Sequence, residues 1–158
     1  MLQSKISSLL TNASELCEDR KYAKALKYYD KVLQIEPDNL KANVDKGVTL
    51  QNLGCISQAI QMYEKALILE PENLDALINM GSALHTLEKY TEAISCYNIA
   101  LKLDKKNSMA LVYKGLSVGE TGNISMAIKY FKKALSIDCN YDLAQISLES
   151  AKNIIHSK

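Results

Sequence analysis

Apolar residues recur at spacings of three and four along most of the chain, which is the pattern of amphipathic helices. Residues 59–73, AIQMYEKALILEPEN, show it clearly, with Ala59 and Tyr63 on the apolar side. Pro71 predicts a helix end, because proline lacks an amide hydrogen and disfavours helical geometry in the residue before it. Residues 40–53 carry another helical pattern just before this one. The sequence therefore predicts a pair of helices joined by a short turn.

The same helix pair is repeated along the chain at a constant spacing. Stretches similar to 59–73 begin at residues 25, 93 and 127, so each copy starts 34 residues after the one before it. Further helical windows lie at residues 74–87 and 108–121. A fixed period in this range is typical of solenoid proteins, in which each unit buries the apolar face of its neighbour. With only 2 prolines and 6 glycines, the chain has too few turn residues for an all-β protein, so we predict an all-α fold.

Equivalent positions in successive copies, called columns below, predict how the helices pack. The second helix of each copy carries one alanine column and one aromatic column: Ala25, Ala59, Ala93 and Ala127, and Tyr29, Tyr63, Tyr97 and Phe131. Small side chains let helices cross at close range, and aromatic rings fill the wider gaps. Gly47, Gly81 and Gly115 recur inside the first helices, where glycine costs about 1 kcal/mol relative to alanine. We therefore expect close backbone packing against the second helix.

The turn between the two helices of a copy carries glycine in two places. Gly54 and Gly122 lie there, whereas Arg20 and Glu88 stand at the equivalent positions of the other copies. Glycine suits a helix end because it tolerates a positive φ angle. The sequence therefore predicts a short turn after each first helix.

The 34-residue unit, the order of its glycine, alanine and aromatic columns, and the closing prolines resemble the tetratricopeptide repeat (TPR) family. The matching repeats are residues 6–39, 40–73, 74–107 and 108–141. The resemblance implies a right-handed α-α superhelix of antiparallel helix pairs, and we expect one domain over residues 1–158. Two departures stand out: the family's frequent tryptophan is absent, and the closing proline survives only as Pro37 and Pro71.

Residues 142–156 are expected to form a capping helix, because the terminal unit of a solenoid needs a polar outer face. The residues expected on its apolar side are Leu143, Ile146, Ile154 and Ile155. Gln145, Glu149 and Lys152 are expected on the other side. In the last repeat, Gly119 lies near the end of the first helix, and we expect that helix to fray there.

Composition and charge place the chain among soluble globular proteins and narrow its partners. Hydrophobic residues make up 47% and charged residues 23%, an ordinary mix for a folded domain. A net charge of +1 gives no strong attraction to nucleic acid or to a membrane surface. No apolar run approaches the ~20 residues needed to span a bilayer.

The cysteines and histidines suggest neither a metal site nor a disulfide framework. Cys17, Cys55, Cys96 and Cys139 lie about forty residues apart without a C-x-x-C pair, whereas metal sites usually bring two ligands close in sequence. No Gly-rich phosphate loop or nucleophile elbow is present, and the acidic residues are scattered rather than gathered. We therefore expect a cytoplasmic protein with reduced cysteines, no cofactor and no enzymatic activity.

The resemblance implies that the first helices line a concave groove holding a peptide or helix of a protein partner. The groove positions hold Leu10, Thr11, Lys41, Val44, Asp45, Val48, Asp75, Ile78, Asn79, Ser82, Val112, Tyr113 and Leu116. Several are apolar, and contiguous exposed apolar patches tend to mark interaction sites. We therefore predict a protein–protein interaction scaffold. Its partner is expected to offer two or three apolar anchors and a basic residue facing Asp45 or Asp75.

One well-known binding mode of the family does not fit. Chaperone-binding members clamp a terminal carboxylate with lysine and asparagine side chains. In one register the clamp positions hold Leu10, Ser14, Asp45, Asp75 and Asn79, and in the next they hold Val44, Val48, Asn79, Met109 and Tyr113. Only Asn79 matches, and the aspartates would repel a carboxylate.

Self-association into a homo-oligomer is the main alternative to a partner-binding groove. The outer column of the second helices is more apolar than a solvated face requires, and it consists of Tyr28, Met62, Cys96 and Tyr130. Two chains could pack through this column or through the capping helix. RNA binding through Lys129, Lys132 and Lys133 is a weaker alternative, because lysines on an outer helix face are usually only solvated.

Overall fold

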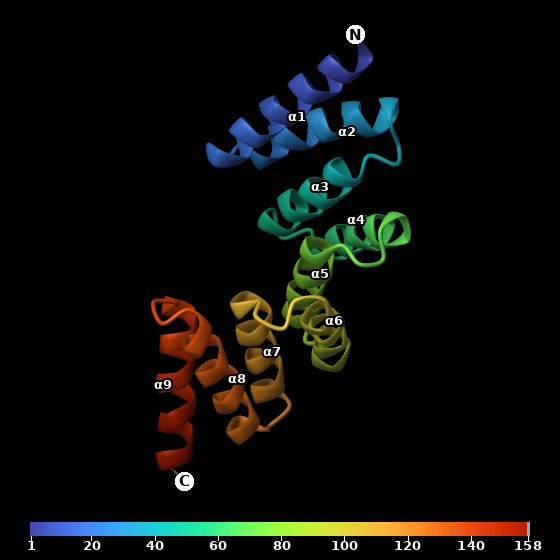
Figure 1. Cartoon of the computed structure of the whole chain (residues 1–158). Coiled ribbons are helices and arrows are strands. Elements are labelled where there is room, and N and C mark those ends of the chain that lie inside the picture. Colours follow the sequence, from blue (N-terminus) through green and yellow to red (C-terminus); the bar gives the residue numbers. More distant parts are fainter. Residues whose placement is uncertain (158) are drawn as a thin grey trace. The chain divides into compact units, whose positions relative to one another are not determined.

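The computed structural model describes residues 1–157, which form helices joined by short turns and linkers (Figure 1). The helices are α1 (Leu2–Glu18), α2 (Tyr22–Ile35), α3 (Leu40–Asn52), α4 (Ile56–Leu69), α5 (Leu74–Thr86), α6 (Tyr90–Leu103), α7 (Ser108–Glu120), α8 (Ile124–Ile137) and α9 (Asp142–His156). No strand occurs among these described residues, so the predicted all-α fold is confirmed. The chain divides into two compact units: unit 1 comprises residues 1–79, and unit 2 begins at residue 80.

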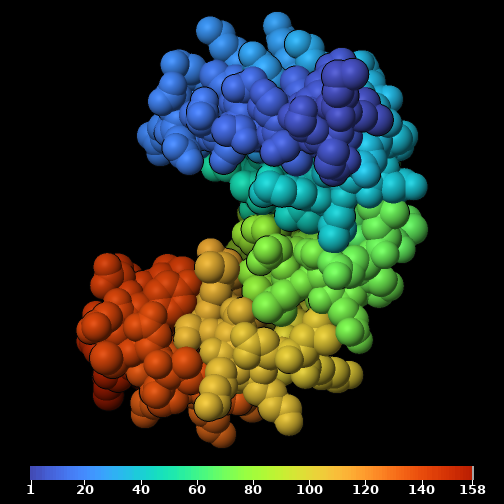
Figure 2. Space-filling model, turned by 45° about the horizontal axis from the view of Figure 1, so that its top comes forward, coloured from blue at the N-terminus to red at the C-terminus, as the bar shows by residue number. Residues whose placement is uncertain are grey.

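Neighbouring helices pack against each other within each unit. In unit 1, α1 packs on α2, α2 on α3 and α3 on α4; in unit 2, α6 packs on α7, α7 on α8 and α8 on α9. Buried side chains form the cores between these helices, and Figure 2 shows the surface that surrounds them. The helix α7 continues through Gly119 to Glu120, so the fraying expected there does not shorten it. The helix pairs predicted from the repeat are therefore formed.

The recurring glycines of the first helices lie directly against aromatic rings of the second helices, as predicted. A Cβ atom on Gly47 would lie 2.5 Å from the ring of Tyr63, and one on Gly115 would lie 2.6 Å from the ring of Phe131. Both rings are buried, so neither can move aside into solvent. Close helix packing thus explains why glycine stands in a helix interior despite its poor helix propensity.

The turns between paired helices share one backbone conformation. Gly54 and Gly122 have φ angles of 78° and 92°, and Arg20 and Glu88 have φ angles of 58° and 60°. All four positions therefore lie in the left-handed region, where a residue with a Cβ atom is strained. Arg20 and Glu88 keep the turn that glycine makes in the other repeats, at a cost in stability.

Replacing Glu88 with glycine is expected to stabilise the protein. The left-handed conformation costs a side-chain-bearing residue about 1–2 kcal/mol, and the extra freedom of glycine in the unfolded chain offsets about 0.4–1 kcal/mol of that. The free energy of unfolding in urea should therefore rise by about 0.5–1 kcal/mol for Glu88→Gly. Gly122→Ala is the reverse change at the equivalent turn, and its added Cβ meets no neighbouring atom. Gly122→Ala should lower the free energy of unfolding. A change in the same direction for both variants would contradict the backbone strain inferred for Glu88.

Acidic and asparagine side chains organise the linkers between helix pairs. After α2, the carboxylate of Glu36 accepts a hydrogen bond from Asn39 Nδ2 at 2.6 Å, and Asn39 Oδ1 accepts one from the amide of Ala42 at 2.9 Å. The asparagine therefore caps the next helix while it is held by the acid that ends the previous one. The same contacts recur after α4, with Glu70, Asn73 and Ala76.

The later linkers end their helices at equivalent positions without the closing proline. The helices α6 and α8 end at Leu103 and Ile137, which are the positions equivalent to the ends of α2 and α4. The carboxylate of Asp104 accepts a hydrogen bond from the amide of Lys106 at 3.0 Å. A side-chain turn of this kind competes with the helical backbone bonds and ends the helix. The loss of proline in the last two repeats therefore does not change the repeat length.

The capping helix forms over the predicted residues, but its apolar side differs from the prediction. The buried side chains of α9 are Ala144, Ser147, Leu148 and Ala151, and α9 packs against α8 and α7. Of the predicted inward residues, Leu143 is partly buried and packs against the core of unit 2, whereas Ile146, Ile154 and Ile155 remain 67%, 43% and 43% exposed. The prediction was wrong for the three isoleucines, because the face of α9 that packs inward carries the small residues Ala144, Ser147 and Ala151 together with Leu148.

Candidate functional site

The residues predicted to line a groove all lie on first helices of the repeats, and they fall into two groups by burial. Val44, Ile78 and Val112 are only 8%, 5% and 0% exposed. This column contributes to packing, which corrects the expectation that it offers apolar anchors. The remaining residues are partly or fully accessible: Leu10, Thr11, Lys41, Asp45, Val48, Asp75, Asn79, Ser82, Tyr113 and Leu116.

A cavity in unit 1 brings several of the predicted residues together. It has a volume of about 570 Å³ and lies between α1 and the start of α3. Leu10, Thr11 and Lys41 line it together with the carboxylates of Glu15 and Glu18. The prediction had not included these two glutamates, because they lie one turn further along α1 than the groove positions of the family. The cavity is therefore more acidic than the predicted residues alone suggest.

Two of the predicted charges in unit 1 pair with each other. Lys41 Nζ lies 2.9 Å from Asp45 Oδ2, one helical turn along α3. Asp75 is exposed and takes part in no ion pair among the described residues. A basic group of a partner would therefore meet less competition at Asp75 than at Asp45.

Polar side chains join the first helix of one repeat to the first helix of the next. In unit 1, Cys17 Sγ lies 3.3 Å from Thr49 Oγ1 and 3.9 Å from the hydroxyl of Tyr29. In unit 2, His85 Nδ1 lies 2.8 Å from Ser117 Oγ. Ser117 Oγ also donates to the carbonyl of Tyr113. A hydroxyl has one hydrogen to donate, so we assign the His85–Ser117 bond to a proton on Nδ1.

The tyrosine column takes part in these contacts as neutral phenols. The hydroxyl of Tyr63 donates to Gln51 Oε1 at 3.0 Å, and Gln51 stands in the same column as Cys17 and His85. Burial raises the pKa of Tyr63 well above its ordinary value, and burial followed by the charge of Asp45 does so for Tyr29. The phenols therefore keep their protons and remain able to donate.

All three of these polar groups are absent between α7 and α9, where the capping helix takes the place of a further first helix. Gly119 replaces Cys17, Gln51 and His85; Phe131 replaces the tyrosines; and Ala151 replaces Thr49 and Ser117. A cavity of about 340 Å³ lies here between α7, α8 and α9, and we call it the α7–α9 pocket. Its lining residues are Gly115, Leu116, Gly119, Glu120, Ile124, Ala127, Phe131, Ile146, Ser147, Ser150, Ala151 and Ile154.

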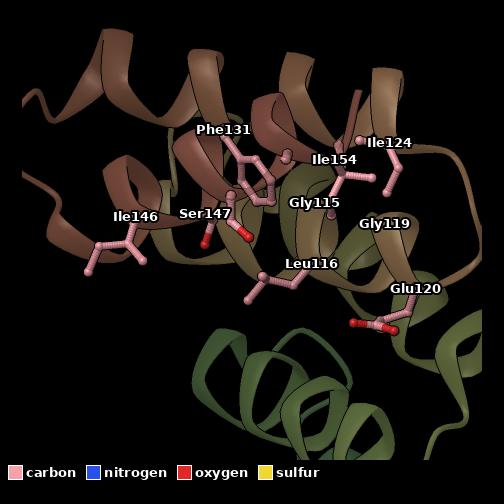
Figure 3. Close-up of a pocket in the computed structure, with 12 residues that line it drawn as sticks. Gly115, Leu116, Gly119, Glu120, Ile124, Phe131, Ile146, Ser147 and Ile154 are labelled. Carbon is pink, nitrogen blue, oxygen red and sulfur yellow. The ribbon is translucent and has the colours of Figure 1, made fainter. Parts of the chain in front are cut away.

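The α7–α9 pocket is mainly apolar, with one charged group at its edge. Figure 3 shows Ile146 and Glu120 towards opposite ends of the pocket, with the ring of Phe131 between them. Only Leu116 among its lining residues had been predicted. Two signals could have indicated the pocket: the glycine at position 119 and the loss of the tyrosine hydroxyl at Phe131. The isoleucines of α9 were missed because the register of that helix was misread.

The outer column of the second helices does not form an exposed apolar stripe. Met62 and Cys96 are each only 8% exposed, and burial raises the pKa of the Cys96 thiol to about 11. The ammonium groups of Lys31 and Lys114 lie over the rings of Tyr28 and Tyr130. The column is therefore partly internal and partly covered by cations.

Within the described residues, no group of three or more His, Cys, Asp or Glu side chains is placed to hold a metal ion. Nor does any described helix have the length and apolar character needed to cross a membrane.

Comparison with solved structures shows the fold. The chain is 20% identical to PilF of Pseudomonas aeruginosa, with a TM-score of 0.88 over 98% of this chain and 71% of that one. It is 22% identical to YrrB, described as a TPR protein with an unusual peptide-binding site, with a TM-score of 0.75 over 95% and 77%. The first TPR of Spaghetti (RPAP3), bound to the HSP90 peptide SRMEEVD, is 23% identical, with a TM-score of 0.71 over 74% and 93%.

Family models give the same answer from the sequence. No curated protein matches the chain. Tetratricopeptide-repeat models match residues 16–78, 74–107 and 114–141, and these ranges fall on the helix pairs described above. The chain is therefore a member of the tetratricopeptide-repeat family.

Proposed function

We propose that the chain is a non-catalytic adaptor that binds a peptide or helix of a partner protein on its first helices. One observation carries the proposal: the repeated alanine and aromatic columns are buried, whereas accessible residues that differ between repeats gather at a cavity of unit 1. The alanine and aromatic columns are buried, and Leu10, Thr11 and Lys41 line the cavity of unit 1.

Two of the structural neighbours support a protein partner. YrrB is described as having a peptide-binding site, and the TPR of RPAP3 is bound to an HSP90 peptide. We propose that the present chain does not use a carboxylate clamp. In unit 1 the clamp positions include Leu10, Asp45 and Asp75, and two aspartates would repel a terminal carboxylate.

The accessible residues suggest the chemistry of the partner. Val48, Tyr113 and Leu116 are half-buried, so a partner could cover their remaining apolar surface. Each buried anchor contributes about 1.5–3 kcal/mol, which after ordering costs corresponds to roughly micromolar affinity for two or three anchors. We propose that a basic residue of the partner faces Asp75, because Asp45 already pairs with Lys41.

The proposed function also includes a domain organisation, the absence of a cofactor and a location in the cell. We propose that the repeats and α9 act together as one domain of residues 1–158, without a cofactor and in the cytoplasm. Glu15 and Glu18 lie together at the cavity of unit 1, but both are exposed to solvent, whereas acid–base catalysis needs a shielded site.

Self-association is the alternative, and its two routes differ. The outer column offers little free apolar surface, since Met62 and Cys96 are buried. The exposed isoleucines of α9 keep the second route open. Light scattering over a dilution series measures the molar mass and distinguishes a partner-binding adaptor from a homo-oligomer. A monomer at every concentration excludes a homo-oligomer as the working form.

The double variant Val48→Asp with Tyr113→Ala is expected to weaken partner binding without unfolding the chain. Peptides selected from a displayed random library against the whole chain provide the ligand, and fluorescence anisotropy gives the dissociation constant. Loss of two anchors should weaken binding by about tenfold or more. Gln61→Ala with Lys129→Ala is the control on exposed second-helix positions. Binding that is unchanged in the first variant and lost in the control would overturn the proposal.

A further inference from the structure

We propose that the α7–α9 pocket holds an apolar side chain of a partner peptide, while Glu120 pairs with a basic residue beside that side chain. This inference rests on the proposed function and specifies the ligand for unit 2. It assigns roles to residues of α9, which the groove positions of the sequence did not include.

The pocket exists because three side chains change together at this step of the array. In unit 1, the first helices of neighbouring repeats are joined by Cys17 and Thr49, and in unit 2 by His85 and Ser117. At the last step the equivalent residues are Gly119 and Ala151, and neither can make a side-chain hydrogen bond. The tyrosine hydroxyl is also absent, because Phe131 stands in that column. The space that the Cys17–Thr49 and His85–Ser117 contacts occupy is therefore apolar and open here.

The size and walls of the pocket fit an apolar side chain. A dry apolar cavity of about 150 Å³ is enough to bind benzene, and this pocket has about 340 Å³. Ile146 and Ile154 contribute to its walls while remaining 67% and 43% exposed. Covering such surface is favourable. A large aromatic side chain, or two aliphatic side chains, would fill the space.

The charge at the edge of the pocket selects a basic neighbour. The carboxylate of Glu120 lines the pocket and forms no ion pair among the described residues. The nearest lysine along α9, Lys152, is already paired with Glu149. A partner carrying lysine or arginine next to its apolar anchor is therefore complementary.

The structure offers a matched pair of variants for the test. Ile154 and Ile155 are adjacent, identical in type and equally exposed at 43%, but only Ile154 lines the pocket. Gly119→Leu fills the space from the α7 side. Gly119→Ala checks that this position accepts a side chain, because its Cβ would meet Ala127 at an ordinary 3.6 Å.

The test uses the whole chain and peptides enriched from a displayed random library. The enriched peptides are expected to carry lysine or arginine next to a large apolar residue. Ile154→Asp and Gly119→Leu should weaken binding by about tenfold or more, and Ile155→Asp by less than about threefold. Glu120→Lys should also weaken binding, and a peptide with glutamate in place of its basic residue should recover binding to that variant.

Changes in the amide chemical shifts of the isotope-labelled chain on peptide binding distinguish failure of this inference from failure of the proposed function. Shifts confined to α1 and α3 would overturn the present inference while leaving the proposed function intact. The inference would also be overturned if Ile154→Asp and Ile155→Asp weakened binding equally. It would likewise be overturned if the enriched peptides were acidic and lost binding to Gly119→Leu. Failure of any peptide to bind the chain would overturn the proposed function together with it.

Discussion

Phe131→Ala is expected to lower the free energy of unfolding by about 3–5 kcal/mol, the usual range for removing a buried aromatic ring. Phe131 is 3% exposed and forms one core with Leu111, Ala127 and Leu148. The ring also stands directly against Gly115, so no neighbouring side chain on that side can fill the space. The change would open the α7–α9 pocket into the core of unit 2 and loosen α9.

Urea unfolding followed by circular dichroism measures this effect. Ile137→Ala on the same helix serves as the control, because Ile137 is 40% exposed and its loss should change stability by less than about 1 kcal/mol. A loss for Phe131→Ala no larger than that of the control would contradict the role of the ring as the centre of this core.

Gly115→Ala and Gly119→Ala are expected to change stability in opposite directions, although the two glycines lie one turn apart on α7. A Cβ at position 115 would sit 2.6 Å from the Phe131 ring, whereas one at position 119 meets only Ala127 at 3.6 Å and Ile124 at 4.0 Å. Overpacking costs about 1–3 kcal/mol, so Gly115→Ala should destabilise. Gly119→Ala should stabilise by up to about 1 kcal/mol through helix propensity.

A double-mutant cycle tests whether a methyl group at position 115 and the Phe131 ring compete for the same space. In Gly115→Ala combined with Phe131→Ala, the added methyl group occupies part of the space that the ring leaves. The combined loss should therefore be smaller than the sum of the two single losses, as is usual for residues in contact. Additive losses would mean that position 115 and the ring do not compete for the same space.

The fold could be predicted from the sequence because the repeated residues are the ones that pack. Gly47, Tyr63 and their equivalents recur at a fixed period, and the structure places them in contact. The linkers were predicted less completely. An acid follows the second helix of every repeat, and an asparagine stands three positions after that acid in the first three repeats, but proline alone was taken as the stop signal. Asp104 and Asp138 replace its effect with side-chain hydrogen bonds.

The candidate site was harder to predict, since it depends on small rotations about helix axes. Val44, Ile78 and Val112 lie one position before residues that are accessible, yet they face the core. In α9, two faces compete: a stripe of small residues including Ala144 and Ala151, and the larger isoleucines. Large apolar residues are the usual choice for an inward face, but the close crossing selected the small ones.

The most direct test of the account is to map which helices a bound peptide touches. Amide chemical shifts of the isotope-labelled chain, titrated with a library-selected peptide, report this residue by residue. We expect the perturbed amides to lie on the first helices of the repeats and on α9, with Leu116 and Ile154 among them. Perturbations confined to the second helices α2, α4, α6 and α8 would contradict it.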